Sequence, residues 1–292
     1  MLVDEQVGFD QLALERTIRS LSRVGIRKAP LTLDRVKAWV KQFDSGAERT
    51  LAWLMLRSLV FRTSEQLEAV LRQAVKSAVN HFTDQVGLEK SPDWRSAIAR
   101  KEGGLTFYCG PPTLENSSSP GKSGDVITRL VNRSFAVEKW YPGNIGTLAI
   151  DERYLIVDDA LYTGIQLEGF LQQWGQPYSE GRIAAVVGIA HEAGIEYIKQ
   201  RFPKLHVFSG ESLKAEHCFS YQCQEWIKNG QWKHDVGPRE TYAQVCERYG
   251  FQDTAEGFGS LGVMVAFEHG IADDALALFW QSSEQWKPLV ER

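Results

Sequence analysis

Four apolar or aromatic residues, 154–157, run directly into two adjacent carboxylates, Asp158 and Asp159, and this stretch constrains the fold most. A short apolar run bounded by polar residues is typical of a strand that is buried on both faces, as in a parallel sheet. Ligands of such sheets bind beyond the carboxyl ends of the strands. The sequence therefore predicts that Asp158 and Asp159 face a ligand site.

The chain changes character near residue 95. Before it, the spacing of apolar residues predicts helices over 32–43 and 47–60 and a third from Thr63 or Ser64. After it, short β-branched or aromatic runs alternate with helical stretches, which is typical of a mostly parallel sheet with right-handed crossovers. The expected strands are 105–109, 154–157, 183–190, 205–208 and 263–267, and the expected helices are 125–132, 165–174, 193–201 and 240–249. The sequence thus predicts a helical leader over residues 1–95 and an α/β domain over residues 96–292.

The five residues that follow the carboxylates are predicted to link the strand to the next helix: Ala160, Leu161, Tyr162, Thr163 and Gly164. The N–H groups of a tight loop that leads into a helix form an anion site, to which the helix dipole adds. Carboxylates beside such a site suit a phosphorylated sugar, because the acids bind ribose hydroxyls or Mg²⁺ and the amides bind the phosphate. The alternative is an acidic strand end followed by an ordinary helix cap at Thr163.

The stretch from the apolar run to Gly164 resembles the phosphoribosyl-pyrophosphate (PRPP) signature of type I phosphoribosyltransferases: an apolar strand, two acids, three loop residues and Thr-Gly. The resemblance implies an α/β fold of phosphoribosyltransferase type and a PRPP or nucleotide ligand with Mg²⁺. It also implies Asp158 and Asp159 as catalytic residues and metal ligands, and the loop over 160–164 as a ligand site. Gln166 stands where the signature has a hydroxyl residue, and the loop supplies no carboxylate as a base. Both departures favour a non-catalytic nucleotide sensor as the alternative to an enzyme.

A second loop, over residues 110–124, is rich in Ser and Pro and ends in Lys122, Ser123 and Gly124 before an expected helix. In the phosphoribosyltransferase resemblance a loop after an early strand holds the pyrophosphate. Lys122 as a cation and the amides of Ser123 and Gly124 as donors would suit that role. The alternatives are a nucleotide-binding P-loop, in which Asn116 would replace the first glycine, and a surface loop with a helix cap.

Three further polar residues lie near the expected site. His191 follows the expected strand 183–190, and Arg129 and Arg133 lie one turn apart on the helix after Lys122. His191 could face the ligand or could be a hydrogen-bonded structural residue. Arg129 and Arg133 could bind an anion or could be solvated or ion-paired residues of the helix surface.

The end of the chain is similar to that of phosphoribosyltransferase-like proteins of bacterial conflict and anti-phage systems. The similarity rests on Phe267-Glu268 in a late expected strand and on the Trp-x-Pro-Leu sequence over 286–289. The helical segment around residues 39–43 is similar to the leader of that group. The resemblance implies an effector that acts on nucleotides in anti-phage defence, with a partner protein of the defence system. The alternative is a scaffold that binds a partner protein through the helical leader.

The composition and charge of the chain exclude several other classes of function. A net charge of −4 argues against direct nucleic-acid binding, because phosphate contacts call for a basic face. No apolar run has the length of a membrane span and no secretory leader is visible, so the expected location is the cytoplasm. The four cysteines fit no disulfide framework in a chain of this length and are expected to be buried or idle thiols: Cys109, Cys218, Cys223 and Cys246.

Overall fold

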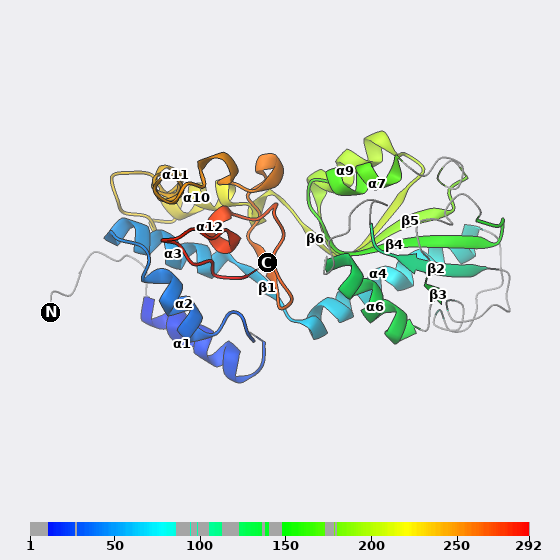
Figure 1. The fold of residues 1–292 in the computed structure, drawn as a ribbon, viewed down its shortest axis with the longest axis horizontal. Coiled ribbons are helices and arrows are strands. Elements are labelled where there is room, and N and C mark those ends of the chain that lie inside the picture. Colours follow the sequence, from blue (N-terminus) through cyan, green and yellow to red (C-terminus); the bar gives the residue numbers. More distant parts are fainter. Residues whose placement is uncertain are drawn as a thin grey trace. The chain divides into compact units, whose positions relative to one another are not determined.

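The computed structural model describes residues 11–26, 28–85, 94, 98, 105–112, 123–135, 138–139, 148–172, 178 and 180–291. The chain forms two compact units: Met1–Ser64 with Lys214–Arg292, here called the terminal unit, and Glu65–Leu213, here called the sheet unit (Figure 1). This division differs from the expected boundary near residue 95. The last part of the expected leader belongs with the sheet, and the last part of the expected α/β domain belongs with the first helices.

The described residues of the sheet unit form five parallel strands in the order β3-β2-β4-β5-β6. Their bounds are β2 Thr106–Gly110, β3 Glu138–Lys139, β4 Glu152–Leu161, β5 Ile183–His191 and β6 His206–Leu213. Strand β4 lies in the middle, where Tyr154 pairs with Tyr108 of β2 and with Ile183 of β5. All nine residues of β5 are buried. The prediction of a parallel sheet is therefore confirmed, and its strands β4 and β5 are buried on both faces over most of their length, whereas β6 is mostly half-buried.

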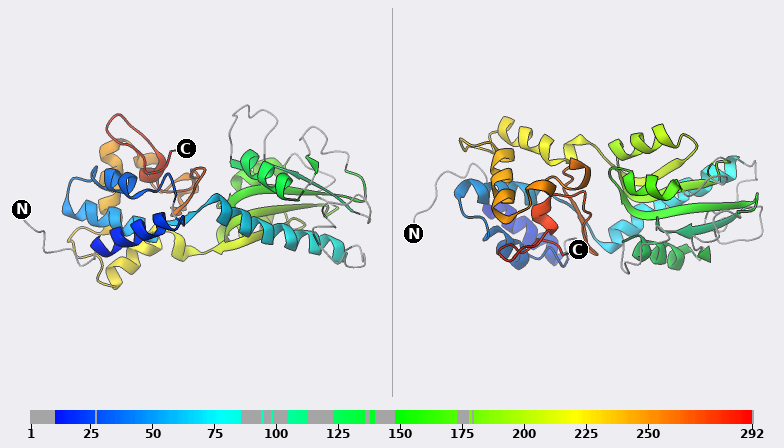
Figure 2. Two further views of the ribbon diagram at one scale, coloured as in Figure 1. Left: turned by 90° about the horizontal axis from the view of Figure 1, so that it is seen from below. Right: turned by 45° about the horizontal axis from the view of Figure 1, so that its top comes forward.

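Helices cover both faces of this sheet, as Figures 1 and 2 show. Helices α7 (Ile165–Leu171) and α9 (Glu192–Arg201) lie on one face, and α4 (Ser64–Gln85) and α6 (Ser123–Phe135) lie on the other. The core under α7 and α9 joins Tyr154 and Ile156 of β4 to Phe170 and Ile198 of the two helices. Burial of these side chains from water is the main force that holds the helices on the sheet.

Two glycines let α4 approach the sheet backbone. A Cβ atom added at Gly210 of β6 would lie 2.0 Å from the Val70 carbonyl oxygen, and one added at Gly188 of β5 would lie 2.4 Å from Leu67 Cδ1. Both distances are far below van der Waals contact. A larger residue at Gly210 would meet the backbone of α4 and displace the helix, whereas one at Gly188 would force the Leu67 side chain to move. This close approach joins α4 to the sheet unit and explains why the units divide at the start of α4.

The described part of the terminal unit is built from helices and one short parallel strand pair. Its helices are α1 Gln11–Arg23, α2 Leu33–Val40, α3 Gly46–Ser58, α10 Phe219–Lys228, α11 Pro238–Tyr249 and α12 Ala277–Trp280, with 3₁₀ turns η2 Ala215–His217, η3 Gln252–Thr254 and η4 Phe258–Ser260. Strand β1 (Val60–Arg62) pairs with β7 (Val265–Phe267), and Val60 N donates to Met264 O at 2.9 Å. The expected helix over 47–60 therefore ends at Ser58, because Val60 is recruited into a strand. The expected strand over 263–267 is present as β7, in this pair rather than in the main sheet.

An aromatic cluster joins the two ends of the chain within the terminal unit. The rings of Trp39 and Phe43 lie 4.9 Å apart, and both pack edge-on against Trp286. The Nε1–H groups of Trp39 and Trp286 both donate to Leu278 O, at 3.0 and 3.2 Å. These buried contacts explain why the C-terminal segment folds with the first helices, because each tryptophan needs an apolar surface and an acceptor.

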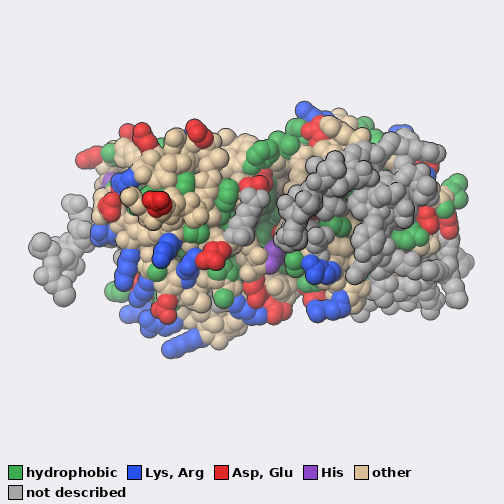
Figure 3. Space-filling model, viewed as in Figure 1, with side chains coloured by type: hydrophobic (Ala, Val, Ile, Leu, Met, Phe, Trp, Pro, Cys, Tyr) green, Lys and Arg blue, Asp and Glu red, His purple; other side chains and the backbone are tan. Residues whose placement is uncertain are grey.

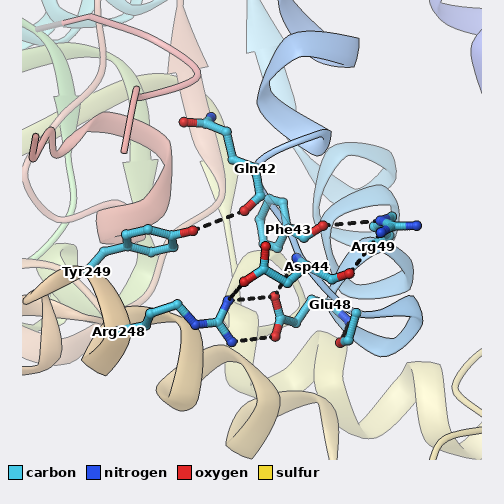
Figure 4. A network of polar contacts seen from close by, with 8 residues as sticks. Gln42, Phe43, Asp44, Glu48, Arg49, Arg248 and Tyr249 are labelled. Carbon is cyan, nitrogen blue, oxygen red and sulfur yellow. Dashed lines mark hydrogen bonds and ion pairs between the residues drawn. The ribbon is translucent and has the colours of Figure 1, made fainter. Parts of the chain in front are cut away.

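A charged network links α11 to α3 in the same unit (Figure 4). Arg248 donates from Nη2 to Glu48 Oε1 at 2.7 Å, and from Nη1 to Glu48 Oε2 at 3.0 Å and to Asp44 Oδ2 at 2.9 Å. Glu48 is buried, and the hydrogen bond from Arg248 is the largest influence that lowers its pKa. Such a two-pronged charged contact is stronger than a neutral hydrogen bond.

Replacing Arg248 with methionine tests this network. We expect Arg248→Met to lower the free energy of unfolding by about 1.5–3 kcal/mol at neutral pH, because it leaves the Glu48 carboxylate without its partner. The lowered pKa of Glu48 means that this contribution is present above the ordinary pKa of glutamate and is lost as the pH falls through the lowered value. Urea unfolding at neutral and acidic pH should therefore show the difference shrinking in acid. Lys228→Met, which removes an exposed pair with Glu225, is the matched control and should cost less than about 1 kcal/mol; equal losses in the two variants would contradict this assignment.

Candidate functional site

The two carboxylates lie near the carboxyl end of the central strand, inside β4 rather than beyond it. Pairing with β5 continues through Asp158 opposite Val187 to Leu161 opposite Ala190. The predicted end of the strand at residue 157 is therefore wrong, because backbone pairing carries the strand through polar residues that the apolar pattern assigns to a loop. The link to α7 is correspondingly short and covers residues 162–164.

Asp158 and Asp159 interact directly with each other. Asp158 is 9% exposed and accepts the Asp159 N–H at 2.9 Å, while Asp159 Oδ1 accepts the Ala160 N–H at 2.8 Å. Burial is the largest cause that raises the pKa of Asp158 well above its ordinary value, and the charge of Asp159 and a hydrogen bond between the two side chains raise it further. A carboxyl group with such a perturbed pKa at a strand end is typical of a functional site.

Ser123, the first residue of α6, joins this pair from a different part of the chain. Its hydroxyl donates to Asp159 Oδ1 at 3.3 Å, and its hydrogen bond to Asp158 lowers the pKa of that group against the larger raising influences. The structure thus brings one residue of the expected pyrophosphate loop to the carboxylates. Gly124 follows in the first turn of α6, and Lys122 lies outside the described residues, so its role stays a prediction.

The loop over 162–164 is held in place by backbone contacts with α9. Gly164 has a φ of +83°, a conformation that glycine adopts without strain. A Cβ atom at Gly194 would lie 2.2 Å from Tyr162 O, so the loop lies directly on the first turn of α9. Sequence reasoning did not identify Gly194, since a glycine inside a helix gives no sign of what packs against it.

The side chains of this segment are turned in different directions. Leu161 and Tyr162 are both 5% exposed and contribute to the core, whereas Thr163 is half-buried and Gln166 is exposed. Ligand contact by Leu161 or Tyr162 is therefore expected through the backbone and not through the side chain. Helix α7 spans seven residues, so the amides of the loop are the main anion donors that this segment offers.

The other polar candidates have structural or solvent-exposed positions. His191 is buried and accepts the Ala193 N–H on Nδ1 at 3.1 Å, which caps α9. Arg129 and Arg133 are exposed on α6. The four cysteines are buried free thiols, as expected, and burial raises the pKa of Cys223 and Cys246 to about 12.

The residues present at the carboxylate pair fit Mg²⁺. Mg²⁺ takes oxygen ligands and is usually bound by one or two carboxylates together with phosphates of the substrate. Asp158 and Asp159 supply two such carboxylates, and within the described part of the chain no group of three or more His, Cys, Asp or Glu side chains is placed to hold a metal. Two carboxylates are what Mg²⁺ commonly takes from a protein when substrate phosphates complete its coordination.

Among the described helices, none has the length and apolar character needed to cross a membrane.

The raised pKa of Asp158 predicts how stability changes with pH when metal and ligand are absent. A buried acid whose pKa is raised on folding contributes stability below its ordinary pKa and loses that contribution as the pH rises through the raised value. Asp158→Asn keeps the acceptor for the Asp159 N–H and cannot ionise. We therefore expect the variant to be more stable than the unmodified chain at neutral pH, by about 0.5–2 kcal/mol, with a smaller difference in acid.

Chemical unfolding over a range of pH checks this expectation. Asp151→Asn is the control, because Asp151 is exposed just before the same strand. A variant Asp158→Asn that is less stable than the unmodified chain at neutral pH would contradict the assigned strain in the carboxylate pair.

The chain matches one protein family and is distantly similar to solved structures. No protein of curated function matches the chain. Among solved structures, the AQ2163 protein from Aquifex aeolicus is similar at 16% identity and a TM-score of 0.31, over 64% of this chain and 86% of that one. Orotate phosphoribosyltransferase from Aeropyrum pernix is similar at 13% identity and a TM-score of 0.25, over 44% of this chain and 67% of that one. The sequence profile described as PRTase-CE matches residues 36–292, which is most of the chain and includes both units, and so the chain belongs to the PRTase-CE family of phosphoribosyltransferase-like conflict-system effectors.

Proposed function

We propose that the chain binds PRPP or a nucleotide, together with Mg²⁺, at Asp158, Asp159 and the segment over residues 160–164, which ends β4 and forms the loop before α7. The buried Asp158 beside the half-buried Asp159, near the carboxyl end of the central strand, is the observation that carries this proposal. Burying an acid beside a second carboxylate costs stability, so the arrangement is best explained by a bound cation or by ribose hydroxyls. Family membership supports the same ligand class, and an effector of this kind would act on nucleotides in anti-phage defence.

The roles of the residues follow from their positions. Asp158 and Asp159 would bind Mg²⁺ or the ribose hydroxyls, and the amides of residues 162–164 would bind a 5′-phosphate. Mg²⁺, when bound, would neutralise phosphate charge. Transfer or cleavage at C1 of the ribose passes through a cation-like state, so the task of the protein is to position the leaving group and stabilise charge.

A non-catalytic nucleotide sensor is the second candidate. The loop between the carboxylates and α7 contains no carboxylate that would serve as a base, and Leu161 and Tyr162 are buried in the core. Gln166 is exposed where a hydroxyl residue would complete the signature. A site of this kind retains binding of the phosphoribosyl group while lacking a group for proton transfer.

Ligand binding is tested by thermal unfolding of the full chain with PRPP and with common nucleotides, each with and without Mg²⁺. At a ligand concentration of about 100 times the dissociation constant, binding stabilises the folded state by about 2.7 kcal/mol. We expect stabilisation that needs Mg²⁺ and is lost in Asp159→Asn, which removes one charge at a half-buried position. Absence of stabilisation by every ligand at millimolar concentration would refute the proposal.

The loop is tested separately with Gly194→Ala. The added methyl group would meet Tyr162 O and displace the loop, so we expect affinity for the stabilising ligand to fall by about tenfold or more. Gly169→Ala in α7 is the matched control, because a Cβ atom there has no neighbour within 4 Å. Equal ligand affinity in the two variants would contradict the proposal that this loop binds the phosphate.

Enzyme and sensor are distinguished by product analysis. The unmodified protein is incubated with PRPP or nucleotides and Mg²⁺, and the products are separated by chromatography. Product that disappears in Asp158→Asn supports an enzyme. Ligand binding without product, in the presence of any partner protein that accompanies the chain, supports a sensor.

A further inference from the structure

The terminal unit contains a cavity of about 450 Å³ that is separate from the carboxylate pair. It is lined by Glu15, Lys37, Val40, Lys41, Arg49 and Trp53, all of which belong to the terminal unit. A volume of this size lies within the range of small-molecule sites. Neither the family resemblance nor the proposed nucleotide site assigns a role to it.

The lining carries an excess of positive charge. Lys37 Nζ pairs with Glu15 Oε2 at 2.8 Å, so these two charges offset one another. Lys41 is exposed at the end of α2, and within the described residues its ammonium group makes no ion pair. Figure 3 shows further Lys and Arg side chains gathered around α1 and α2, although the whole chain has a net charge of −4.

Arg49 is held at the cavity without a carboxylate partner among the described residues. Its Nε donates to Phe43 O at 3.1 Å and its Nη2 donates to Asp44 O at 2.8 Å, which fixes the guanidinium (Figure 4). The nearby carboxylates of Asp44 and Glu48 both bind Arg248 instead. The positive charge of Arg49 is therefore left available to a ligand, in an orientation that the backbone has already set.

Apolar groups complete the lining. Val40 and Trp53 are 6% and 4% exposed, so they form a largely dry wall beside the cations Lys41 and Arg49. A ligand that matches this combination has an anionic group of about two charges and a compact apolar body.

We propose that this cavity binds a small aromatic phosphate ester, with the phosphate on Lys41 and Arg49 and the ring against Val40 and Trp53. The charge excess favours a dianion over a neutral molecule, and the cavity volume of about 450 Å³ fits a single small ligand. The site is expected to be independent of Mg²⁺, since among the described residues that line it only Glu15 supplies an acidic oxygen.

Ligand-observed NMR titration of the full chain with phenyl phosphate, in EDTA, tests the proposal. Phenol and inorganic phosphate are titrated in parallel, and we expect phenyl phosphate to bind more tightly than either. Lys41→Gln should raise the dissociation constant of phenyl phosphate by about tenfold or more, which corresponds to one charged hydrogen bond. Lys228→Gln is the matched control, because Lys228 also ends a helix of the terminal unit, and it should leave the dissociation constant unchanged.

A variant of the other site makes the result specific. Asp159→Asn should bind phenyl phosphate as tightly as the unmodified chain does. Failure of the proposed nucleotide site and failure of the proposed cavity site are therefore distinguishable. The proposal is overturned if phenyl phosphate does not bind at millimolar concentration, or if Lys41→Gln and Lys228→Gln bind it equally. Binding of a single-stranded oligonucleotide in place of phenyl phosphate would also overturn it, in favour of a nucleic-acid surface.

Discussion

Burial of Asp158 beside Asp159 is the costly interaction on which the site depends. The parallel sheet places β4 between β2 and β5 and carries its pairing past the carboxylates to Leu161. Water is thereby excluded from Asp158, and the neighbouring charge adds to the penalty for ionising it. Ser123 and backbone N–H groups offset only part of this penalty. The energy stored in the pair is available to whichever cation or hydroxyl group neutralises it.

Much of the sheet is readable in the sequence, because parallel strands that are buried on both faces appear as continuous apolar runs. The run over 183–190 predicts β5 almost to its ends, and Thr32 predicts the start of α2, where its side chain caps Arg35 N. Strand β1 escapes this reasoning, because Val60 continues the apolar spacing of the preceding helix. Only its partner Val265, far along the chain, makes it a strand.

Part of the candidate site can also be predicted from the sequence, because it follows a continuous apolar run. The acids at the end of an apolar run mark Asp158 and Asp159, whereas the contact of Ser123 with Asp159 joins residues 36 apart in sequence. The role of Gly194 depends on a backbone approach from Tyr162 that has no local signature. Local pattern therefore identifies the acids, and tertiary packing decides which residues support them. The charge of the cavity beside Arg49 also depends on tertiary packing. Arg248 binds the nearby carboxylate of Glu48, so that carboxylate does not pair with Arg49.

Binding of PRPP at the carboxylate pair is the central claim, and equilibrium dialysis with labelled PRPP measures it most directly. The unmodified chain and the double variant Asp158→Asn/Asp159→Asn are compared in Mg²⁺ and in EDTA. We expect the unmodified chain to retain PRPP in Mg²⁺, and the double variant to retain none while remaining folded. Equal retention of PRPP by the two proteins in Mg²⁺ would contradict the assignment of this pair as the ligand site.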